Sequence, residues 1–578
     1  LYDLVRYAET NSYEVDGLKP FAWKYRDYVI KSLNDDKPYD QFVREQIAGD
    51  ELDEVTVETR TATGFSRLGI FDRSPADHQL ARADELDDIV TTISQVFLGL
   101  TINCARCHDH KIDPIPQTDY YSMVSFVSDI EPYDKGSNIN YDVSPPEVIH
   151  RFNKLNREVD QWSAEMRVVE QRGIVRMSAE DQRKTEGWQR KQVLREKIKD
   201  YLSDEDWKLR LSLIHKINAN RKAIKEFPNR ETVLSVARSN PNHPVTRVFF
   251  RGNPQVPQDE VSPAFPELFQ SELPTITQPK SDAKTAGRRK VLTAWMTAPE
   301  NRMTARVMVN RVWQFHFGRG IVRSSNNFGQ LGSPPTHPEL LDYLAAQFTQ
   351  SGWKLKALHK RIMTSQAYQM SSSMNEAGFA KDSDNDLFWR FDVRRLSAEE
   401  VRDSLLAVNG SLNPKLYGPS IYEKLPQEVL ARQSVPGKGW GNSSEEERNR
   451  RSIYIHVKRS LLTPILSVFD LPDTDHSCEA RFTTLQPGQA LSLLNSEFVH
   501  TQAKRLATSI NQMIDGGAQQ KLTAAFELVY ARDATPEEIE DVMELIRKLE
   551  TDYNKSADEA FELACLSMLN WNEFIFVD

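Results

Sequence analysis

The sequence has little of what marks several familiar classes of protein. Four cysteines in 578 residues are too few for a disulfide-rich scaffold. No stretch approaches the roughly 18 to 20 apolar residues that a membrane-spanning helix requires, and the first residues carry no signal-peptide pattern. The net charge of −10 argues against a phosphate-binding surface, so nucleic acid is not an expected partner. Walker, dinucleotide-binding, G-x-S-x-G and H-E-x-x-H motifs are also missing, which leaves the usual nucleotide-binding and hydrolase classes without support.

The composition that remains is typical of a large globular protein. Hydrophobic residues make up 39% of the chain and charged residues 27%, which supplies buried cores without a bias toward disorder. A chain of 578 residues is too long for one core. Apolar residues recur mostly at the three- and four-residue spacings of α-helices. We therefore predict a mainly α, multi-domain protein with a charged helical hairpin and a small β-containing linker region.

The patterns divide the chain into four predicted domains. The hairpin is predicted because apolar residues recur every three and four positions among many charges, which suits an arm or a surface for a protein partner. In chain order the domains are a helical domain with a cysteine motif over residues 1–146, a coiled-coil-like helical hairpin over 147–226, a small β-containing and proline-rich connection over 227–285, and a mainly helical domain over 286–578.

Local signals mark where several of these elements begin. Capping boxes at Thr336, Ser397 and Thr535 predict helix starts. Arg394 and Arg395, just before one of them, are expected to form salt bridges beside the helix. The chain opens in what reads as the inside of a helix without an N-cap, so we expect a preceding segment, in which a targeting signal could lie.

The motif with the clearest chemistry is Cys104-Ala105-Arg106-Cys107-His108. A C-x-x-C-H run can attach haem c covalently through its two thiols, while the histidine binds the iron axially. On an α-helix all three side chains would share one face. We therefore predict one covalent haem c held by Cys104, Cys107 and His108. Because c-type haem is attached outside the cytoplasm, this predicts an exported protein of the periplasm, the cell envelope or the extracellular space.

Other interpretations of the motif stay open. The cysteine pair could be a redox dithiol or disulfide, or half of a zinc site, although the chain has no second C-x-x-C. His110 would point away from the iron of His108 if both were on a helix. We expect His110 to be a hydrogen-bonded histidine behind the site, with a haem propionate contact or a second metal as the alternatives.

The sequence leaves the sixth ligand of the iron undetermined. Met123 is close in the sequence but lies in an apolar run, which favours a place in the core. His316, His337 and His359 are remote candidates, and an open site is equally admissible. Whether Cys478 and Cys565 pair with each other is also undetermined.

A second cluster of polar side chains runs from Asn310 to Gly320. Asn310, Arg311 and His316 are candidate catalytic residues, and a substrate pocket would first be sought near them. The competing interpretation is structural, with an aromatic pair in the core and a glycine that ends the helix.

Longer strings around these motifs resemble an exported planctomycete family in which a cytochrome c-like region is paired with a second domain, both largely of unknown function. The resemblance implies a haem c site in residues 1–146 and a location in the cell envelope, and it supplies no established reaction. Similar proteins often carry a further cytochrome c domain upstream, which implies a redox partner of that kind. The strings are residues 4–10, 23–30, 46–50 and 99–111 in the first domain, and 309–320, 333–341 and 485–491 in the second.

Three functional hypotheses follow. The leading one is an exported c-type haem redox protein whose electron transfer is coupled to oxidation or reduction of an extracellular substrate, which would make it a haem-dependent oxidoreductase. One alternative is a cell-envelope interaction or scaffold protein with a structural haem. Another is a non-haem metal enzyme that uses His108 and His110.

Overall fold

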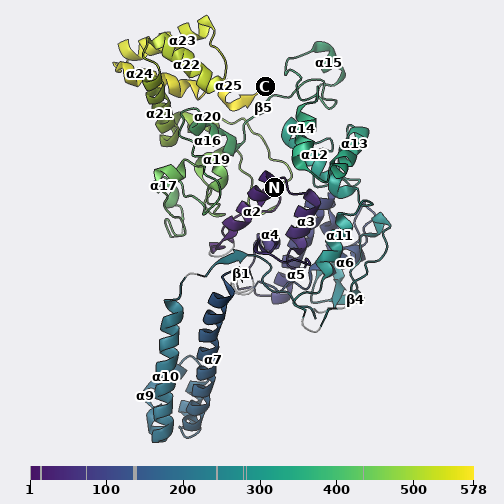
Figure 1. Cartoon of the computed structure of the whole chain (residues 1–578), viewed down its shortest axis with the longest axis vertical. Coiled ribbons are helices and arrows are strands. Elements are labelled where there is room, and N and C mark those ends of the chain that lie inside the picture. The colour runs from purple at the N-terminus through teal and green to yellow at the C-terminus, as the bar shows by residue number, and fades with distance from the viewer. Residues whose placement is uncertain are drawn as a thin grey trace. The chain divides into compact units, whose positions relative to one another are not determined.

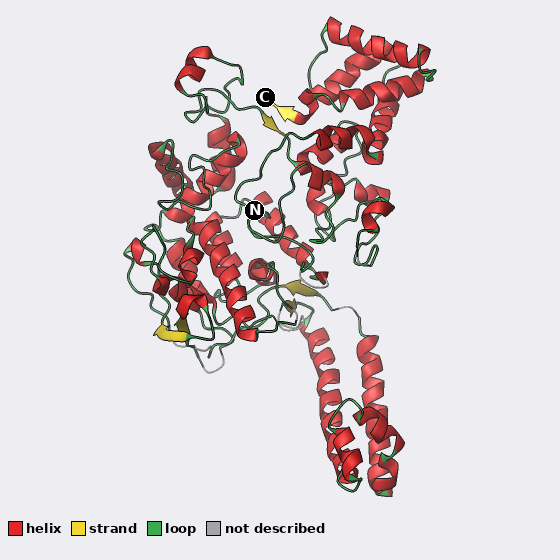
Figure 2. Cartoon of the chain, turned by 180° about the vertical axis from the view of Figure 1, so that it is seen from behind, coloured by secondary structure: helices red, strands yellow, loops and turns green. Residues whose placement is uncertain are grey.

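The computed structural model of the chain is dominated by helices. Its strands form small two-stranded pairs, which confirms the predicted mainly α, multi-domain class (Figure 2). Within the described ranges, every helix is too short or too polar to cross a bilayer. The structure describes residues 2–12, 16–72, 74–133, 139–228, 230–242, 245–277, 279–280, 283–433 and 435–578.

The chain forms two compact units. One contains the residues up to Tyr141 together with Val233–Asp578, and the other is Asp142–Thr232. The predicted hairpin range, 147–226, falls inside the second unit, whereas the predicted first and last domains share the first unit.

The second unit is built on two long helices, α7 (Pro146–Ile174) and α10 (Asp204–Lys225), which lie side by side (Figure 1). They run in opposite directions, because Arg172 pairs with Asp206 at 2.7 Å while Asn220 donates to Glu158 at 2.8 Å. Proline at the first position of α7 needs no hydrogen-bond partner there, which favours a helix start. The connecting segment adds α8 (Ala179–Thr185), α9 (Arg190–Glu196) and the 3-10 helix η4 (Ile198–Tyr201).

The first unit begins with helices that surround the cysteine motif. α5 starts at Asp77, whose carboxylate accepts the N–H groups of Gln79 and Leu80, and a π-helical turn follows it up to Gly99. These elements are α2 (Ala22–Asn34), α3 (Tyr39–Ala48), α4 (Val57–Ala62), η1 (Thr63–Arg67), α5 (His78–Ile93), η2 (Ser94–Leu98), η3 (Ile102–Arg106) and α6 (Gln117–Val127).

Helices from the middle of the chain share one core with this N-terminal part. Phe97, Val309 and Leu344 belong to the same cluster of buried side chains. Burial of each such side chain stabilises the fold by about 1.5–3 kcal/mol. The helices concerned are η6 (Glu267–Phe269), α11 (Arg288–Met296), α12 (Met303–Phe317), α13 (Pro338–Gln350) and α14 (Leu355–Met363). The short helices η5 (Phe250–Gly252) and α15 (Glu376–Lys381) contribute no residue to this core.

A second core holds the C-terminal helices together. Leu506, Phe526 and Cys565 are fully buried in it. The helices are α16 (Ala398–Ala407), η7 (Ser452–Tyr454), α19 (Pro464–Val468), α20 (Pro487–Asn495), α21 (Glu497–Met513), α22 (Ala518–Tyr530), α23 (Pro536–Thr551), α24 (Ala557–Met568) and α25 (Asn572–Ile575). The short helices α17 (Gln427–Leu430) and α18 (Glu445–Arg448) lie in the same part of the sequence and contribute no residue to this core.

Two of the three predicted capping boxes are confirmed. Ser397 caps α16 and Thr535 caps α23, and the backbone N–H of each cap residue donates in return to the carboxylate of a glutamate three residues later. The prediction at Thr336 is wrong, because α13 begins with Pro338 and its N-cap is His337. The Thr336 N–H donates instead to the Ile321 carbonyl at 3.0 Å.

The strands are short. β3 (Thr246–Phe249) pairs antiparallel with β4 (Pro257–Val261) and aligns Thr246 with Val261. The remaining pairs are β1 (Asn140–Asp142) with β2 (Thr232–Leu234), and β5 (Arg394–Arg395) with β6 (Phe576–Val577).

Candidate functional site

The cysteine motif lies on a short 3-10 helix and not on an α-helix as expected. η3 ends at Arg106, so Cys107 and His108 follow it in irregular backbone. Gly99 ends the preceding turn at φ 63° and Pro114 limits any helix from the other side, and between them the chain forms only this 3-10 helix.

The 3-10 geometry separates buried from exposed side chains. Residues three apart lie on the same side of such a turn. Ile102 and Ala105 are buried in the core, whereas Cys104 and Cys107, also three apart, are exposed. Both cysteines carry free thiols, so both are accessible for covalent attachment.

The His108 ring has a defined orientation. Its Nδ1 lies 2.7 Å from the backbone carbonyl oxygen of Asp109. Because a carbonyl can only accept, Nδ1 carries a proton, and in the neutral ring Nε2 has the free lone pair. The imidazole is exposed. This is the arrangement of a histidine prepared to bind a metal through Nε2.

Arg106, between the two cysteines, anchors the motif. Its guanidinium pairs with Asp84 at 2.5 Å and with Asp87 at 3.3 Å, both on α5. Its carbonyl accepts bonds from Gln117 Nε2 at 2.9 Å and from the Tyr121 hydroxyl at 3.0 Å, both on α6. Two helices thus fix the position of the cysteines.

The tip of the β3–β4 hairpin lies against Cys107. A Cβ built on Gly252 would be 2.8 Å from the Cys107 Sγ. Gly252 has φ 72° and follows Arg251 at φ 50°, so the chain turns sharply at this point. Gln117 Nε2 also donates to the Phe249 carbonyl at 3.0 Å, which holds the hairpin to the motif.

His110 is oriented differently from His108. It is buried, and its Nδ1 accepts the Asp113 N–H at 2.8 Å. Its Nε2 must then carry the proton, and the Thr101 hydroxyl lies 3.3 Å away as the acceptor. The Asp113 carboxylate in turn accepts the Gln330 N–H at 2.7 Å. His110 therefore has the contacts of a structural histidine.

The candidates for a sixth ligand fall in different surroundings. Met123 is 1% exposed and belongs to the first core. His337 pairs through Nδ1 with the Thr336 hydroxyl at 3.0 Å and lies against the Phe388 ring.

His316 and His359, predicted separately, contact each other. His316 Nε2 lies 2.9 Å from His359 Nδ1, and the Tyr368 ring packs edge-on against His316. Burial lowers the pKa of both rings, and for His316 the neighbouring His359 lowers it further. The pair joins α12 to α14.

Asn310 fixes the loop that contains Val322 and Ser325 by hydrogen bonds. It is fully buried and accepts the Val322 N–H at 2.8 Å while donating to the Val322 carbonyl at 2.9 Å and to Ser325 Oγ at 3.1 Å. This bonding uses the side chain completely, so the structural interpretation suits Asn310.

Arg311 connects distant parts of the first unit. Its Nη2 donates to the Gln95 carbonyl at 2.9 Å, to the Ser325 carbonyl at 3.3 Å and to Asn326 Oδ1 at 2.7 Å. Gln95 belongs to η2, the turn that leads into the cysteine motif. Arg311 thus supports the turn that leads into the first motif, and Asn310 supports the loop at Val322 and Ser325.

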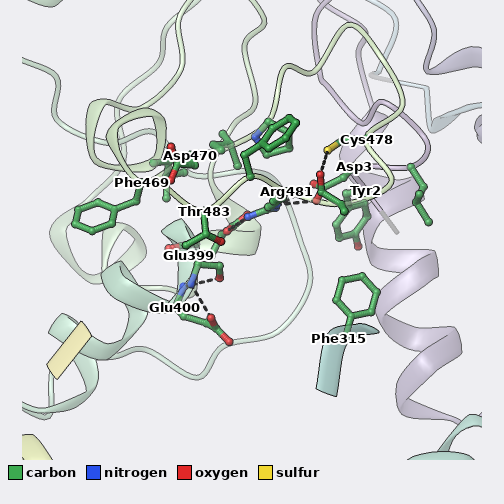
Figure 3. A pocket seen from close by; sticks show the side chains of 18 of the residues that line it. Tyr2, Asp3, Phe315, Glu399, Glu400, Phe469, Asp470, Cys478, Arg481 and Thr483 are labelled. Atoms are coloured by element: carbon green, nitrogen blue, oxygen red, sulfur yellow. Dashed lines mark hydrogen bonds and ion pairs between the residues drawn. The ribbon is translucent and has the colours of Figure 1, made fainter. Parts of the chain in front are cut away.

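A cavity of about 560 Å³ is also lined by Arg311. Figure 3 shows its wall, in which Arg481 bridges Asp3 and Glu399. The guanidinium lies 2.7 Å from Asp3 Oδ2 and 2.8 Å from Glu399 Oε1. Arg394 forms a two-point pair with Glu400 at 2.9 and 3.0 Å.

Sequence reasoning missed most of this cavity. Its wall joins residues as far apart as Asp3 and Arg481, and no local pattern predicts such a meeting. Two signals were available: Arg311, beside which a substrate pocket was predicted, lines the cavity, and so does the pair of arginines before Ser397. The predicted salt bridges of that pair are confirmed, Arg394 with Glu400 and Arg395 with Asp470.

The structure also shows the state of the other two cysteines and tests the proposal of a non-haem metal site. Cys478 is partly exposed and Cys565 is buried, and both are free. Among the described residues, no group of three or more His, Cys, Asp and Glu side chains is arranged to hold a metal ion. The interpretation of His108 and His110 as joint metal ligands therefore gains no support.

Comparisons with known proteins match two parts of the chain. Residues 1–132 match PSCyt2, a protein of unknown function (DUF1549), and residues 288–546 match PSD1, a protein of unknown function (DUF1553). Neither a curated protein nor a solved structure gives a match. Over both ranges the chain is therefore similar to planctomycete cytochrome c-associated domains of unknown function, and the matches do not extend to a cytochrome c-like fold.

Proposed function

We propose that the chain is an exported c-type haem protein that transfers electrons, with the haem held by Cys104, Cys107 and His108. The observation that carries the proposal is the orientation of His108, whose Nδ1 donates to the Asp109 carbonyl and leaves Nε2 available. Metal-binding histidines are commonly fixed by a bond of this kind. A haem bound here would supply a one-electron iron couple.

The surroundings of the thiols support the same proposal. Cys104 and Cys107 are free and exposed, as thioether formation requires. Arg106 and its contacts with α5 and α6 keep the peptide between them in one conformation. A rigid attachment segment limits movement of a bound redox group, which suits electron transfer.

The cellular part of the proposal rests on chemistry and on the comparisons. Haem c is attached outside the cytoplasm, so the protein would work in the periplasm, the cell envelope or outside the cell. The cytochrome c association of both matched families supports a second cytochrome c domain or protein as the redox partner. Oxidation or reduction of an extracellular substrate is the reaction we assign to such a pair.

The test is production of the full chain in a periplasm that has the haem c maturation machinery. We expect a Soret band, and haem that stays with the protein after acid–acetone extraction. His108→Ala should lose the native axial ligand and change the spectrum, whereas His500→Ala, at another exposed histidine, should not.

Cysteine variants test the attachment. Cys104→Ser with Cys107→Ser should release the haem on extraction, while Cys565→Ala, in the C-terminal core, should keep it covalently bound. Native protein without a Soret band would overturn the proposal. A haem that binds covalently but cannot be reduced and reoxidised would favour a structural role in a scaffold protein instead.

A further inference from the structure

Two imidazole rings meet where α12 and α14 lie side by side (Figure 1). His316 comes from α12 and His359 from α14. The Nε2 atom of His316 lies 2.9 Å from the Nδ1 atom of His359. Both residues are only partly buried, so solvent reaches the pair. Two nitrogen ligands are therefore brought together at the surface of the first unit.

Both rings favour the form that binds a metal ion. Burial lowers the pKa of His316, and the neighbouring His359 lowers it further. Burial also lowers the pKa of His359. Only a neutral imidazole has a lone pair to give, since protonation occupies both nitrogens. At and above neutral pH the pair is therefore in its metal-binding form.

The electrostatic surroundings favour a cation. His316 lies in the last turn of α12, and the C-terminal end of a helix carries a partial negative charge. The Asp36 carboxylate acts on His359 in the direction that raises its pKa, which is the direction of stabilising a positive charge. An ion at the pair would be attracted by both.

The separation of the two nitrogens fits one class of ion. Metal–nitrogen bonds are about 2.0–2.1 Å long, so two of them that meet at about 90° hold their nitrogens about 2.9 Å apart. This is the separation between His316 and His359. An angle of about 90° between neighbouring ligands is typical of square-planar and octahedral ions such as Cu²⁺ and Ni²⁺. Tetrahedral Zn²⁺ would need a separation of about 3.3 Å.

We infer that His316 and His359 together bind a divalent transition-metal ion of the Ni²⁺ and Cu²⁺ class. One of the two facing nitrogens carries the hydrogen of the bond between the rings. On binding, that ring transfers this proton through solvent to its own other nitrogen, and both rings turn their lone pairs toward the ion, so no net proton is released. Water completes the coordination, because among the described residues no third His, Cys, Asp or Glu joins the pair. The inference does not depend on haem binding at Cys104 and Cys107.

Chemical modification tests the site on the full chain. Diethyl pyrocarbonate reacts with neutral imidazole, and peptide mass mapping gives the rate at each histidine. We expect Ni²⁺ to slow modification of His316 and His359 several-fold over the same range of concentration, because one ion occupies both rings, and EDTA to restore both rates. Mg²⁺, which prefers oxygen ligands, should leave them unchanged. Full reactivity of both rings in Ni²⁺, or protection of only one, overturns the inference.

Variants test whether the two rings act together. In His316→Gln, protection of His359 should need about tenfold more Ni²⁺ or above, since one of the two chelating ligands is lost. His337→Gln is the matched control, because His337 is also partly buried in the first unit but pairs with the Thr336 hydroxyl instead of a second imidazole. Unchanged protection of His359 in His316→Gln overturns the inference. The comparison of Ni²⁺ with Mg²⁺ on the unaltered chain decides independently of whether a variant folds.

Discussion

Gly252 lies so close to Cys107 that a Cβ at position 252 would come 2.8 Å from the Cys107 sulfur. The hairpin that carries Gly252 lies outside both ranges matched by known families. A segment without a family match thus sets the space around one of the two thiols proposed to hold haem. The approach is possible because glycine has no side chain and accepts φ 72° without strain.

Gly252→Ala is expected to slow alkylation of Cys107 relative to Cys104 in the haem-free protein, because the new methyl group occupies the space beside the sulfur. Peptide mass mapping measures both rates. Gly287→Ala is the matched control: Gly287 has a similar φ of 69°, but nothing lies within 4 Å of its Cβ position. If Cys107 is alkylated at the same rate in Gly252→Ala as in Gly287→Ala, the methyl group at position 252 does not restrict access to the Cys107 sulfur.

Asn310→Ala is expected to destabilise the first unit by about 3 kcal/mol, since it removes three buried hydrogen bonds and leaves Val322 without partners for its N–H and carbonyl groups. Urea unfolding measures the change in the free energy of unfolding. Gln369→Ala, at an exposed position, should change it little. Wild-type stability of Asn310→Ala with loss of function would show instead that Asn310 acts in a site.

Stability is expected to fall as the pH rises from about 4.5 to about 7, because of Glu51. Burial, opposed by Arg289 and reinforced by Asp129 and Asp50, raises the pKa of this carboxyl from 4.5 to about 7. Over that interval the folded state keeps a proton that the unfolded state has lost, so unfolding releases a proton and becomes easier at higher pH.

Glu51→Gln should remove this contribution, which amounts to at most about 1.4 kcal/mol per pH unit. Urea unfolding at a series of pH values measures it, with the exposed Glu54→Gln as the control. An unchanged pH dependence in Glu51→Gln would assign the effect to another group.

The His316–His359 pair is expected to take up protons at a lower pH than free histidines. Burial lowers the pKa of both rings, and His359 lowers that of His316 further. The folded state therefore binds fewer protons than the unfolded state as the pH falls below 6.5, and this part of the stability is lost toward acid. Proton NMR titration of the two rings should give midpoints below 6.5, while a midpoint at or above that value for either ring would contradict the contact.

Much of the fold could be predicted because its signals are local. The caps at Ser397 and Thr535 depend on residues three apart, and the hairpin helices depend on spacings of three and four. At Thr336 the local pattern failed because Pro338 moves the helix start by one residue. The cysteine motif was found for the same local reason, but its 3-10 backbone could not be predicted from the motif itself.

The rest required tertiary contacts. His316 and His359 are 43 residues apart, and their pairing depends on how α12 packs on α14. The cavity wall joins Asp3 to Arg481, which are 478 residues apart in the sequence. No spacing in the sequence predicts such a contact.

The two family matches meet at hydrogen bonds that cross from one to the other. Phe328 N–H donates to the Gly99 carbonyl at 2.7 Å, and Gln330 N–H donates to Asp113 at 2.7 Å. These bonds and the shared core connect the two matched ranges of this chain. A gene fission between the two ranges would therefore yield fragments that expose apolar surface and aggregate, so the two segments are expected to be inherited together.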